Sequence, residues 1–306
     1  MRLSSPDKVL WPEAGVTKRD LHDYYTAVAD RLLPQLAGRP LTLKRHNAGV
    51  HAEGFLQKNL PDFAPASIGR YRVWTETSQR EVAYALADDV TDLQWFAQQN
   101  AVELHPWFSR VDRPDRADVL AFDLDPGDGG PTVTRAAWWL RAVLDELDLP
   151  SLVKTSGKRG LHLYVPVQRR YTFGELRGFG LAVSRACADR HSDELTVEMR
   201  KADRGERLLL DWSRAGPAQT LAAAWSPRAH PGATVSMPLA WEEVDEGLDP
   251  TAFTIATALQ RPDHWAAPPP PQRIERARAA LAEAGYPAAD RSPRARTTPD
   301  APAGER

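Results

Sequence analysis

Two aspartates, Asp123 and Asp125, lie two residues apart at the end of the apolar run 119–122. In a β-strand alternate side chains share a face, so both carboxylates would point to one side while Phe122 and Leu124 pack on the other. Two anions this close repel each other unless a cation lies between them, and hard divalent cations prefer carboxylate oxygens. The pattern predicts a strand that ends in a metal site. The alternative is a strand that runs into a solvated turn, because Asp, Pro and Gly all favour turns.

A loop with two glycines separates the apolar segments 152–155 and 161–167, which we predict to be strands. The backbone N–H groups of this loop, together with Ser156, Lys158 and Arg159, would form a phosphate-binding site. The stretch 154–170 contains no Asp or Glu, whereas it has Lys or Arg at positions 154, 158, 159, 169 and 170. The other interpretation is an ordinary hairpin with a basic, soluble tip.

His162 alternates with Leu161 and Leu163 in the second of these predicted strands. Because side chains alternate between the two faces of a strand, His162 should face away from the core, on the same side as Tyr164. The alternative is a structural role, because a lone histidine is more often structural than catalytic.

Asp211 ends a third strand, predicted over residues 207–211, in which three consecutive leucines indicate burial. A carboxylate at the end of a buried strand is costly unless it is paired or bound to a metal. A third aspartate would complete a site for two cations. The alternative is a strand that ends in a turn initiated by the aspartate.

These three segments have the order and spacing found in archaeo-eukaryotic primase–polymerases. The chain most resembles the polymerase domain of bacterial DNA ligase D, which acts in non-homologous end joining. The resemblance covers roughly residues 3–265. It extends to segments 6–12, 17–18, 23–25, 38–45, 54–59 and 235–241.

The resemblance implies roles for residues that match the motifs of this family. The metal ligands would be Asp123, Asp125 and Asp211, holding two divalent ions, Mn²⁺ or Mg²⁺. The residues that hold the incoming nucleotide would be Ser156, His162, Lys158 or Arg159, and Arg228 at its phosphates, with His105 near its sugar and the primer end.

The same resemblance implies contacts with DNA. Lys8 and Lys18 would receive the 5′-phosphate on the downstream side of a gap or break, and Phe55 would stack against the template. Lys44 and Lys58, in two other matching segments, are also predicted to bind DNA.

The implied fold is α/β (α+β), with a central, largely antiparallel, RRM-like sheet flanked by helices. The implied activity is that of a template-directed DNA/RNA nucleotidyltransferase that fills gaps, extends ends and prefers ribonucleotides. The implied partners are DNA with a gap or a double-strand break and a 5′-phosphate, nucleoside triphosphates, a Ku-type end-binding protein and a separate DNA ligase, since the chain resembles the free-standing form of the domain. Two other functions stay open from the residues: a metal-dependent phosphodiesterase or nuclease, and a non-catalytic module that binds and bridges DNA ends.

Composition limits the location and the redox chemistry of the chain. Its formal net charge is −2, so DNA contact would be limited to basic patches. The single cysteine, Cys187, excludes an internal disulfide and lies in an apparent amphipathic helix as a small core residue. No apolar run approaches the ~20 residues that a membrane-spanning helix needs. We therefore expect a cytoplasmic protein with no membrane partner. The family resemblance implies that it is bacterial and associated with the nucleoid when bound to DNA.

Capping and periodicity predict helices that begin near Thr17 and that cover residues 92–104, 136–144 and 174–190. Residues 1–265 are predicted to form the catalytic domain. From residue 266 onward the composition changes to a Pro-rich linker, a helix candidate over 272–285 and a tail with too little apolar surface to fold.

Overall fold

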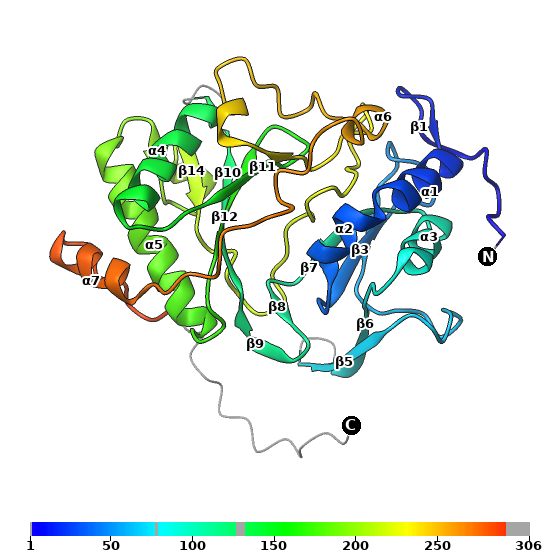
Figure 1. Cartoon of the computed structure of the whole chain (residues 1–306), viewed down its shortest axis with the longest axis horizontal. Helices are drawn as coiled ribbons and strands as arrows, with labels where there is room; N and C mark the ends of the chain where they lie inside the picture. The colour runs from blue at the N-terminus through cyan, green and yellow to red at the C-terminus, as the bar shows by residue number, and fades with distance from the viewer. Residues whose placement is uncertain (1, 77–78, 127–131, 292–306) are drawn as a thin grey trace.

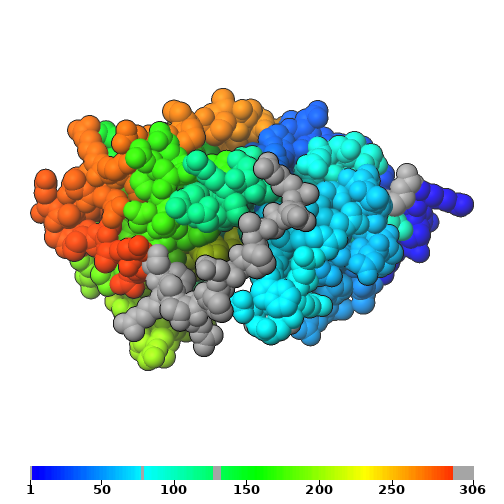
Figure 2. Space-filling model, turned by 90° about the horizontal axis from the view of Figure 1, so that it is seen from below, coloured from blue at the N-terminus to red at the C-terminus, as the bar shows by residue number. Residues whose placement is uncertain are grey.

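The computed structural model describes residues 2–76, 79–126 and 132–291. They form two halves, an N-terminal half that ends at Ala117 and a C-terminal half that follows it, each built around its own β-sheet (Figure 1). Figure 2 shows the N-terminal residues, coloured blue to cyan, on one side of the molecule and the green to red residues on the other.

The N-terminal half carries a mainly antiparallel sheet in the strand order β4-β3-β6-β5, with β7 also paired to β3. Its helices lie together on one side of this sheet (Figure 1). In chain order the elements are β1 (Val9–Trp11), β2 (Val16–Thr17), α1 (Lys18–Ala27), α2 (Ala29–Leu36), β3 (Leu41–Arg45), β4 (Phe55–Gln57), β5 (Arg70–Thr75), β6 (Arg80–Ala85), α3 (Val90–Gln98), β7 (Ala101–Pro106), β8 (Ser109–Arg110) and β9 (Arg113–Ala117).

The helix predicted to begin near Thr17 is α1, and the predicted capping box is present between Thr17 and Asp20. The helix predicted over 92–104 was placed too far along the chain. Asp89 caps α3 from its side chain, and α3 ends at Gln98. Asn100 then adopts a φ of 56°, a left-handed conformation that asparagine tolerates and that ends the helix. The next residues form β7, so the last predicted turn of helix is a strand.

The C-terminal half carries the larger sheet, in the strand order β13-β14-β10-β12-β11-β15, antiparallel except between β13 and β14. The mixed α/β fold with an antiparallel sheet flanked by helices, predicted from the sequence, is confirmed. In chain order the elements are β10 (Val119–Asp125), α4 (Val133–Glu146), β11 (Leu152–Thr155), β12 (Leu161–Pro166), α5 (Phe173–Arg190), β13 (Leu195–Thr196), the 3₁₀ turn η1 (Lys201–Asp203), β14 (Leu208–Asp211), β15 (Pro238–Leu239), the 3₁₀ turn η2 (Trp241–Glu243), α6 (Ile255–Ala258) and α7 (Glu275–Glu283).

The core of this half lies between the sheet and the two helices that cover one of its faces, α4 and α5. Leu120, Phe122 and Leu124 of β10 are fully buried, and complete burial of each such side chain stabilises the fold by about 1.5–3 kcal/mol. Cys187 is buried in α5 as predicted, and this burial raises the pKa of its thiol to about 12. The opposite face of the sheet is left for polar side chains.

The segment that follows residue 265 lies against the C-terminal half. Gln272 exchanges backbone hydrogen bonds with the end of β12, at 2.8 Å to Pro166 and 2.9 Å from Gln168. The helix predicted within residues 272–285 is α7, which packs on α5. The predicted domain boundary at residue 265 stays a prediction, and the tail beyond residue 291 lies outside the described residues. None of the helices in the described part of the chain combines the length and apolar character needed to cross a bilayer.

Candidate active site

Adjacent strands of the C-terminal sheet place one polar side chain each in a row. Asp123 on β10 is paired with His162 on β12 and with Asp211 on β14, and His162 is paired with Lys154 on β11. Residues directly opposite each other in antiparallel strands point to the same face, so these side chains are neighbours. Each of these residues is at most 6% exposed. Asp123 and Asp211, which lie far apart in the sequence, therefore converge.

We call Asp123, Asp125 and Asp211 the acidic centre. Arg214 bridges two of its members, with its Nη2 atom 3.0 Å from Asp123 Oδ2 and 2.8 Å from Asp211 Oδ2. Asp211 Oδ1 also accepts hydrogen bonds from the backbone N–H and the hydroxyl of Ser213, at 2.9 and 2.6 Å. These contacts explain how two buried carboxylates lie side by side without an uncompensated charge.

The environments of the carboxylates push their pKa values apart. Burial alone would raise the pKa of Asp123, but His162 and Arg214 hold it at about 2. Desolvation and repulsion from Asp123 instead raise the pKa of Asp125 above its ordinary value, although Asp125 lies at the exposed end of β10. The acidic centre therefore carries more negative charge than Arg214 balances.

His162 links the acidic centre to a buried lysine. Its Nε2 atom lies 3.3 Å from Asp123 Oδ1, and its Nδ1 atom lies 2.7 Å from Lys154 Nζ. Lys154 also donates to Ser236 Oγ at 2.6 Å. Since an amine donates to Nδ1, the ring proton of neutral His162 is on Nε2 and faces Asp123. Burial and the charge of Lys154 lower the pKa of His162 to about 4, so the ring is neutral at pH 7.

His162 lies on the face that the sequence predicted. The side chain does point away from the apolar core, yet it is 3% exposed because the polar face of the sheet is covered. Ser236 and Arg228, from the segment after β14, lie over that face.

The acidic centre fits divalent cations. No group of three or more His, Cys, Asp or Glu side chains in the described ranges is already arranged around a single ion position. The guanidinium of Arg214, however, stands between two carboxylates where a cation would be held. Burial, and then repulsion from Asp123 and Asp211, raise the pKa of Asp125 although Arg214 acts in the opposite direction, so the aspartates still repel one another. Carboxylate oxygens are also the ligands that Mg²⁺ and Mn²⁺ prefer.

The loop between β11 and β12 combines a buried serine with cations. Ser156 Oγ accepts hydrogen bonds from the backbone N–H groups of Lys158 and Gly160, both at 3.1 Å. Those two groups, predicted to cradle phosphate, are thus already used within the loop, and the proton of the Ser156 hydroxyl is what it can offer to a ligand. Lys158 is half-buried, whereas Arg159 is exposed and its charge acts on Asp125.

Two glycines allow the loop to approach its neighbours. A Cβ atom at Gly160 would lie 2.4 Å from the carbonyl oxygen of Leu124, next to the acidic centre. Gly157 has a φ of +68°, and a Cβ atom there would lie 2.6 Å from Arg228 Cγ. Only glycine permits both close approaches, because other residues carry the Cβ atom that would collide.

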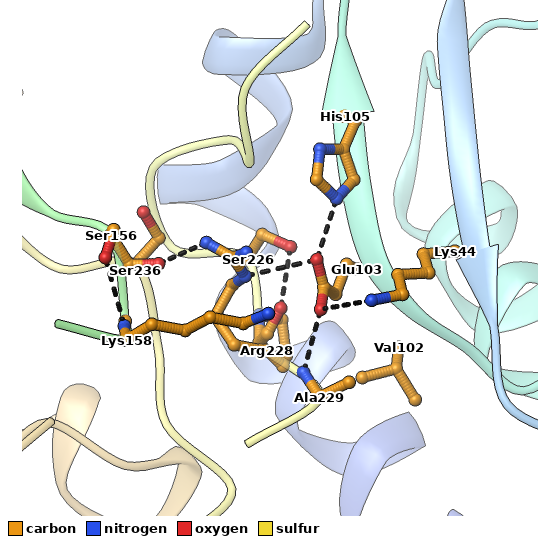
Figure 3. A network of polar contacts seen from close by, with 12 residues as sticks. Lys44, Val102, Glu103, His105, Ser156, Lys158, Ser226, Arg228, Ala229 and Ser236 are labelled. Atoms are coloured by element: carbon orange, nitrogen blue, oxygen red, sulfur yellow. Dashed lines mark hydrogen bonds and ion pairs between the residues drawn. The ribbon is translucent and has the colours of Figure 1, made fainter. Parts of the chain in front are cut away.

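A second cluster lies beside this loop, and we call it the basic centre. It consists of Lys44, His105, Lys158 and Arg228. The first, second and fourth of these contact the carboxylate of Glu103 (Figure 3), and the charge of Glu103 acts on Lys158. The structure thus brings together residues predicted to bind nucleotide with Lys44, predicted to bind DNA. Arg228 also donates to the carbonyl oxygen of Ser156, which joins the basic centre to the loop.

The remaining predicted DNA contacts lie in the N-terminal half. Lys8 donates to the carbonyl oxygen of Asn47, and Lys18 donates to that of Ser4 at 2.9 Å. Burial and the charges of Lys8 and Arg45 lower the pKa of Lys18. A group of neighbouring cations therefore gathers near the start of α1.

Phe55 and Lys58 lie beside each other on β4 and the residue that follows it, and both line a surface pocket of about 450 Å³. Phe55 is 46% exposed, and the guanidinium of Arg45 lies 5.2 Å from the centre of its ring. An exposed aromatic ring beside a cation is suited to stacking a nucleic-acid base. The roles assigned to these two residues stay predictions.

Sequence reasoning missed the residues that balance charge at both centres, Arg214, Lys154 and Glu103. Arg214 follows Asp211 by three residues, a spacing that permits contact across a turn. Lys154 precedes the loop and belongs to the basic stretch 154–170. Glu103 lies in the segment predicted to be helical, and that wrong prediction could not give the direction in which its side chain points.

The comparisons with known proteins agree on one family. Residues 17–268 match the family model described as the LigD primase-polymerase domain. A multifunctional non-homologous end joining protein LigD from Mycolicibacterium smegmatis is 35% identical over 249 residues, covering 80% of this chain and 32% of that protein. The bifunctional LigD protein of Bacillus subtilis is 31% identical over 264 residues, covering 85% of this chain and 42% of that protein.

A solved structure described as the polymerase domain of Mycobacterium tuberculosis ligase D in complex with DNA has a TM-score of 0.79 and 32% identity. The match covers 85% of this chain and 93% of that one. This chain spans about a third of the length of the mycobacterial relatives, which are longer proteins.

Proposed function

This chain belongs to the LigD primase–polymerase domain family, and from that membership we propose that it is a template-directed nucleotidyltransferase. Its task would be to fill gaps and extend ends of DNA during double-strand break repair by non-homologous end joining, with a preference for ribonucleotides. The observation that carries the proposal is the contact of the acidic centre with the Ser156–Gly160 loop, which in turn contacts the basic centre. Nucleotidyl transfer needs these two kinds of site side by side.

Asp123, Asp125 and Asp211 would hold two divalent ions, Mn²⁺ or Mg²⁺. When bound, such ions lower the pKa of an attacking hydroxyl and offset the charge of a triphosphate. Asp123 is suited to this role because its pKa of about 2 keeps it ionised at any working pH. Arg214 would give up its bridging contacts with Asp123 and Asp211 as the ions bind.

In the proposed reaction the 3′-hydroxyl oxygen of the primer attacks the α-phosphorus of the nucleoside triphosphate. A new P–O bond forms, the bond between the α-phosphorus and the bridging oxygen of pyrophosphate breaks, and the hydroxyl proton passes to water. Ser156, Lys158 and Arg228 would hold the phosphates in line, so the residues act mainly by positioning and by offsetting charge. His162 would offer its Nε2 proton at the boundary between the carboxylates and the phosphates.

The N-terminal half would bind the DNA. Lys8 and Lys18 would receive the 5′-phosphate across a gap, and Phe55 would stack against the template, with Lys58 nearby. A structural relative of this chain is described in complex with DNA. A separate DNA ligase and a Ku-type end-binding protein would complete the repair at the bacterial nucleoid.

The test is primer extension on a gapped duplex that carries a 5′-phosphate, with Mn²⁺ and each nucleoside triphosphate. Wild-type protein should extend the primer by the gap length, and Asp123→Ala should not. Equal extension by the variant would refute the proposal. Nucleotide release from labelled DNA without added triphosphate would instead indicate a nuclease. DNA binding without any extension by wild type would indicate an end-bridging module.

A further inference from the structure

Glu103 is a buried carboxylate on β7, between the two halves of the molecule. It is 1% exposed, and a carboxylate without solvent must be paired or it destabilises the fold. The neighbouring residue Leu104 joins the same two halves, since its backbone N–H donates to Ser226 Oγ and its carbonyl oxygen accepts from Ala223 N, both at 2.9 Å. Glu103 therefore lies where the N-terminal sheet meets the segment that follows β14.

The two oxygens of Glu103 have partners from three parts of the chain (Figure 3). Oε2 lies 2.8 Å from His105 Nε2 and 3.2 Å from Arg228 Nε. Oε1 accepts the backbone N–H of Ala229 at 3.0 Å and lies 3.6 Å from Lys44 Nζ. One carboxylate thus contacts a strand neighbour, an adjacent strand and a loop from the other half.

The charges around Glu103 are unequal. Burial alone would raise the pKa of Glu103, yet His105 and Arg228 hold it well below its ordinary value, so the group is ionised. Burial and the charges of Arg228 and Lys44 lower the pKa of Lys158. A single anion faces several cations that repel one another, and the excess of positive charge is what a triphosphate would neutralise.

Glu103 also fixes which nitrogen of His105 carries the proton. An ionised carboxylate can only accept a hydrogen bond, so His105 Nε2 is the donor. Burial and the charge of Arg228 lower the pKa of His105, which leaves the ring neutral and Nδ1 free of a proton. The proton-free Nδ1 is then an acceptor, able to receive a hydroxyl donor.

We propose that Glu103 is a positioning residue of the nucleotide site: without touching the substrate, it holds His105 and Arg228, from opposite halves of the molecule, in the orientation that receives one nucleoside triphosphate. This inference rests on the proposed function and assigns a role to Glu103, a residue to which the proposed function gives none. The Nε atom of Arg228 forms the ion pair with Glu103, and its Nη1 atom donates to the carbonyl oxygen of Ser156, so one guanidinium joins Glu103 to the loop.

The variant that tests the inference is Glu103→Gln, which keeps the shape and removes the charge. Its KM for the nucleoside triphosphate should rise by ~10–100-fold, the usual effect of losing a supporting contact behind a ligand. Its kcat should change much less, because the lost interaction helps to bind the nucleotide rather than the transition state alone. Glu103→Asp keeps the charge at a shorter reach, and its KM should fall between those of wild type and Glu103→Gln.

Asp118→Asn is the matched control. Asp118 is also a largely buried carboxylate that holds two arginines, 2.7 Å from Arg39 and 2.9 Å from Arg110, but it lies outside both centres. Its loss should lower the melting temperature comparably and leave KM unchanged. A rise in KM no larger for Glu103→Gln than for Asp118→Asn would overturn the inference.

A second readout is independent of polymerase activity. In protein labelled with ¹⁵N-histidine, His105 of the wild type should show a protonated Nε2 and an unprotonated Nδ1. In Glu103→Gln the amide can donate as well as accept, so the two ring nitrogens should shift toward a mixture of tautomers. Binding of an α,β-methylene triphosphate analogue should weaken in parallel. An unchanged His105 signal with unchanged analogue binding would contradict the inference, whereas absence of primer extension by wild type would count against the proposed function alone.

Discussion

The acidic centre and the basic centre are electrostatic opposites, and each contacts one residue of the other sign. Arg214 lies between the aspartates, and Glu103 lies among the lysines and the arginine. Neither counter-charge is sufficient: besides burial, repulsion from Asp123 and Asp211 raises the pKa of Asp125, and besides burial, repulsion from Arg228 and Lys44 lowers the pKa of Lys158. The comparison indicates that one centre lacks cations and the other lacks a polyanion. A metal-bound triphosphate would satisfy both at once.

The largest effect should follow from neutralising the acidic centre. Asp123→Asn and Asp211→Asn should each lower the rate of primer extension by at least ~100-fold, since losing even a supporting contact behind a metal ligand costs 10–100-fold. Single-turnover extension at saturating nucleotide measures this. Asp112→Asn, at an exposed ion pair with Arg169, is the control and should extend at the wild-type rate. If Asp211→Asn kept its activity, the acidic centre would not be the cation site that the comparison of the two centres requires.

The next effect separates the two cations of the loop. Lys158→Met should raise KM for the triphosphate by ~10-fold or more, because a charge-assisted hydrogen bond to phosphate contributes about 1.5–3 kcal/mol. Arg159→Met should change KM by less than ~3-fold, as expected for an exposed charge. Steady-state titrations of the nucleotide on one gapped substrate give both values. A larger rise in KM for Arg159→Met than for Lys158→Met would mean that Arg159, and not Lys158, binds the triphosphate.

A smaller effect is expected for the cations near α1, which bind DNA rather than nucleotide in this account. Lys8→Ala and Lys18→Ala should each weaken binding to a gapped duplex about 3–10-fold and reduce the salt slope by about one. Fluorescence anisotropy at several salt concentrations measures both quantities. The same duplex without its 5′-phosphate is the control, and there the variants should bind as wild type does. Equal losses on both duplexes would remove the assigned 5′-phosphate contact.

The smallest effect concerns the stability of the fold. Replacing Asp125 should stabilise the protein, although loss of a carboxylate from the acidic centre should lower its activity. Because the folded-state pKa of Asp125 is raised, its protonated form stabilises the fold at low pH, and that contribution is lost as pH rises through the folded-state pKa. Asp125→Asn should therefore stabilise the metal-free protein at pH 7 by less than ~1 kcal/mol, given the exposure of the side chain. Urea unfolding at pH 7 and near pH 3.5 tests this, and the gain should shrink at the lower pH. Destabilisation at pH 7 would mean that the carboxylates do not repel each other.

Strand positions were predictable where apolar residues alternate or run continuously. The strand expected to carry Asp123 and Asp125 is β10, and the strand expected over residues 152–155 is β11, since each begins as an apolar stretch and ends at polar or turn residues. The proximity of Asp123 and Asp211 was expected only because the family resemblance implies that both are ligands of the same metal site. Periodicity within each strand says which face a side chain occupies, and it does not say which strands are neighbours.

The partners of the charged residues were not predictable, and Glu103 shows why. Leu93, Phe96 and Ala97 recur at helical spacing, so periodicity favoured a helix that continues to residue 104. The left-handed backbone of Asn100 ends that helix, and the following strand turns Glu103 toward a loop more than a hundred residues later. Lys154 meets His162 only through the register of a hairpin that its own sequence does not fix.

A crystal structure with Mn²⁺ and an α,β-methylene triphosphate analogue would test the opposed charges of the two centres most directly. The account predicts anomalous manganese density among Asp123, Asp125 and Asp211, phosphates against Ser156, Lys158 and Arg228, and Arg214 released from its bridge. Manganese bound elsewhere, with Arg214 still joining Asp123 to Asp211, would contradict it.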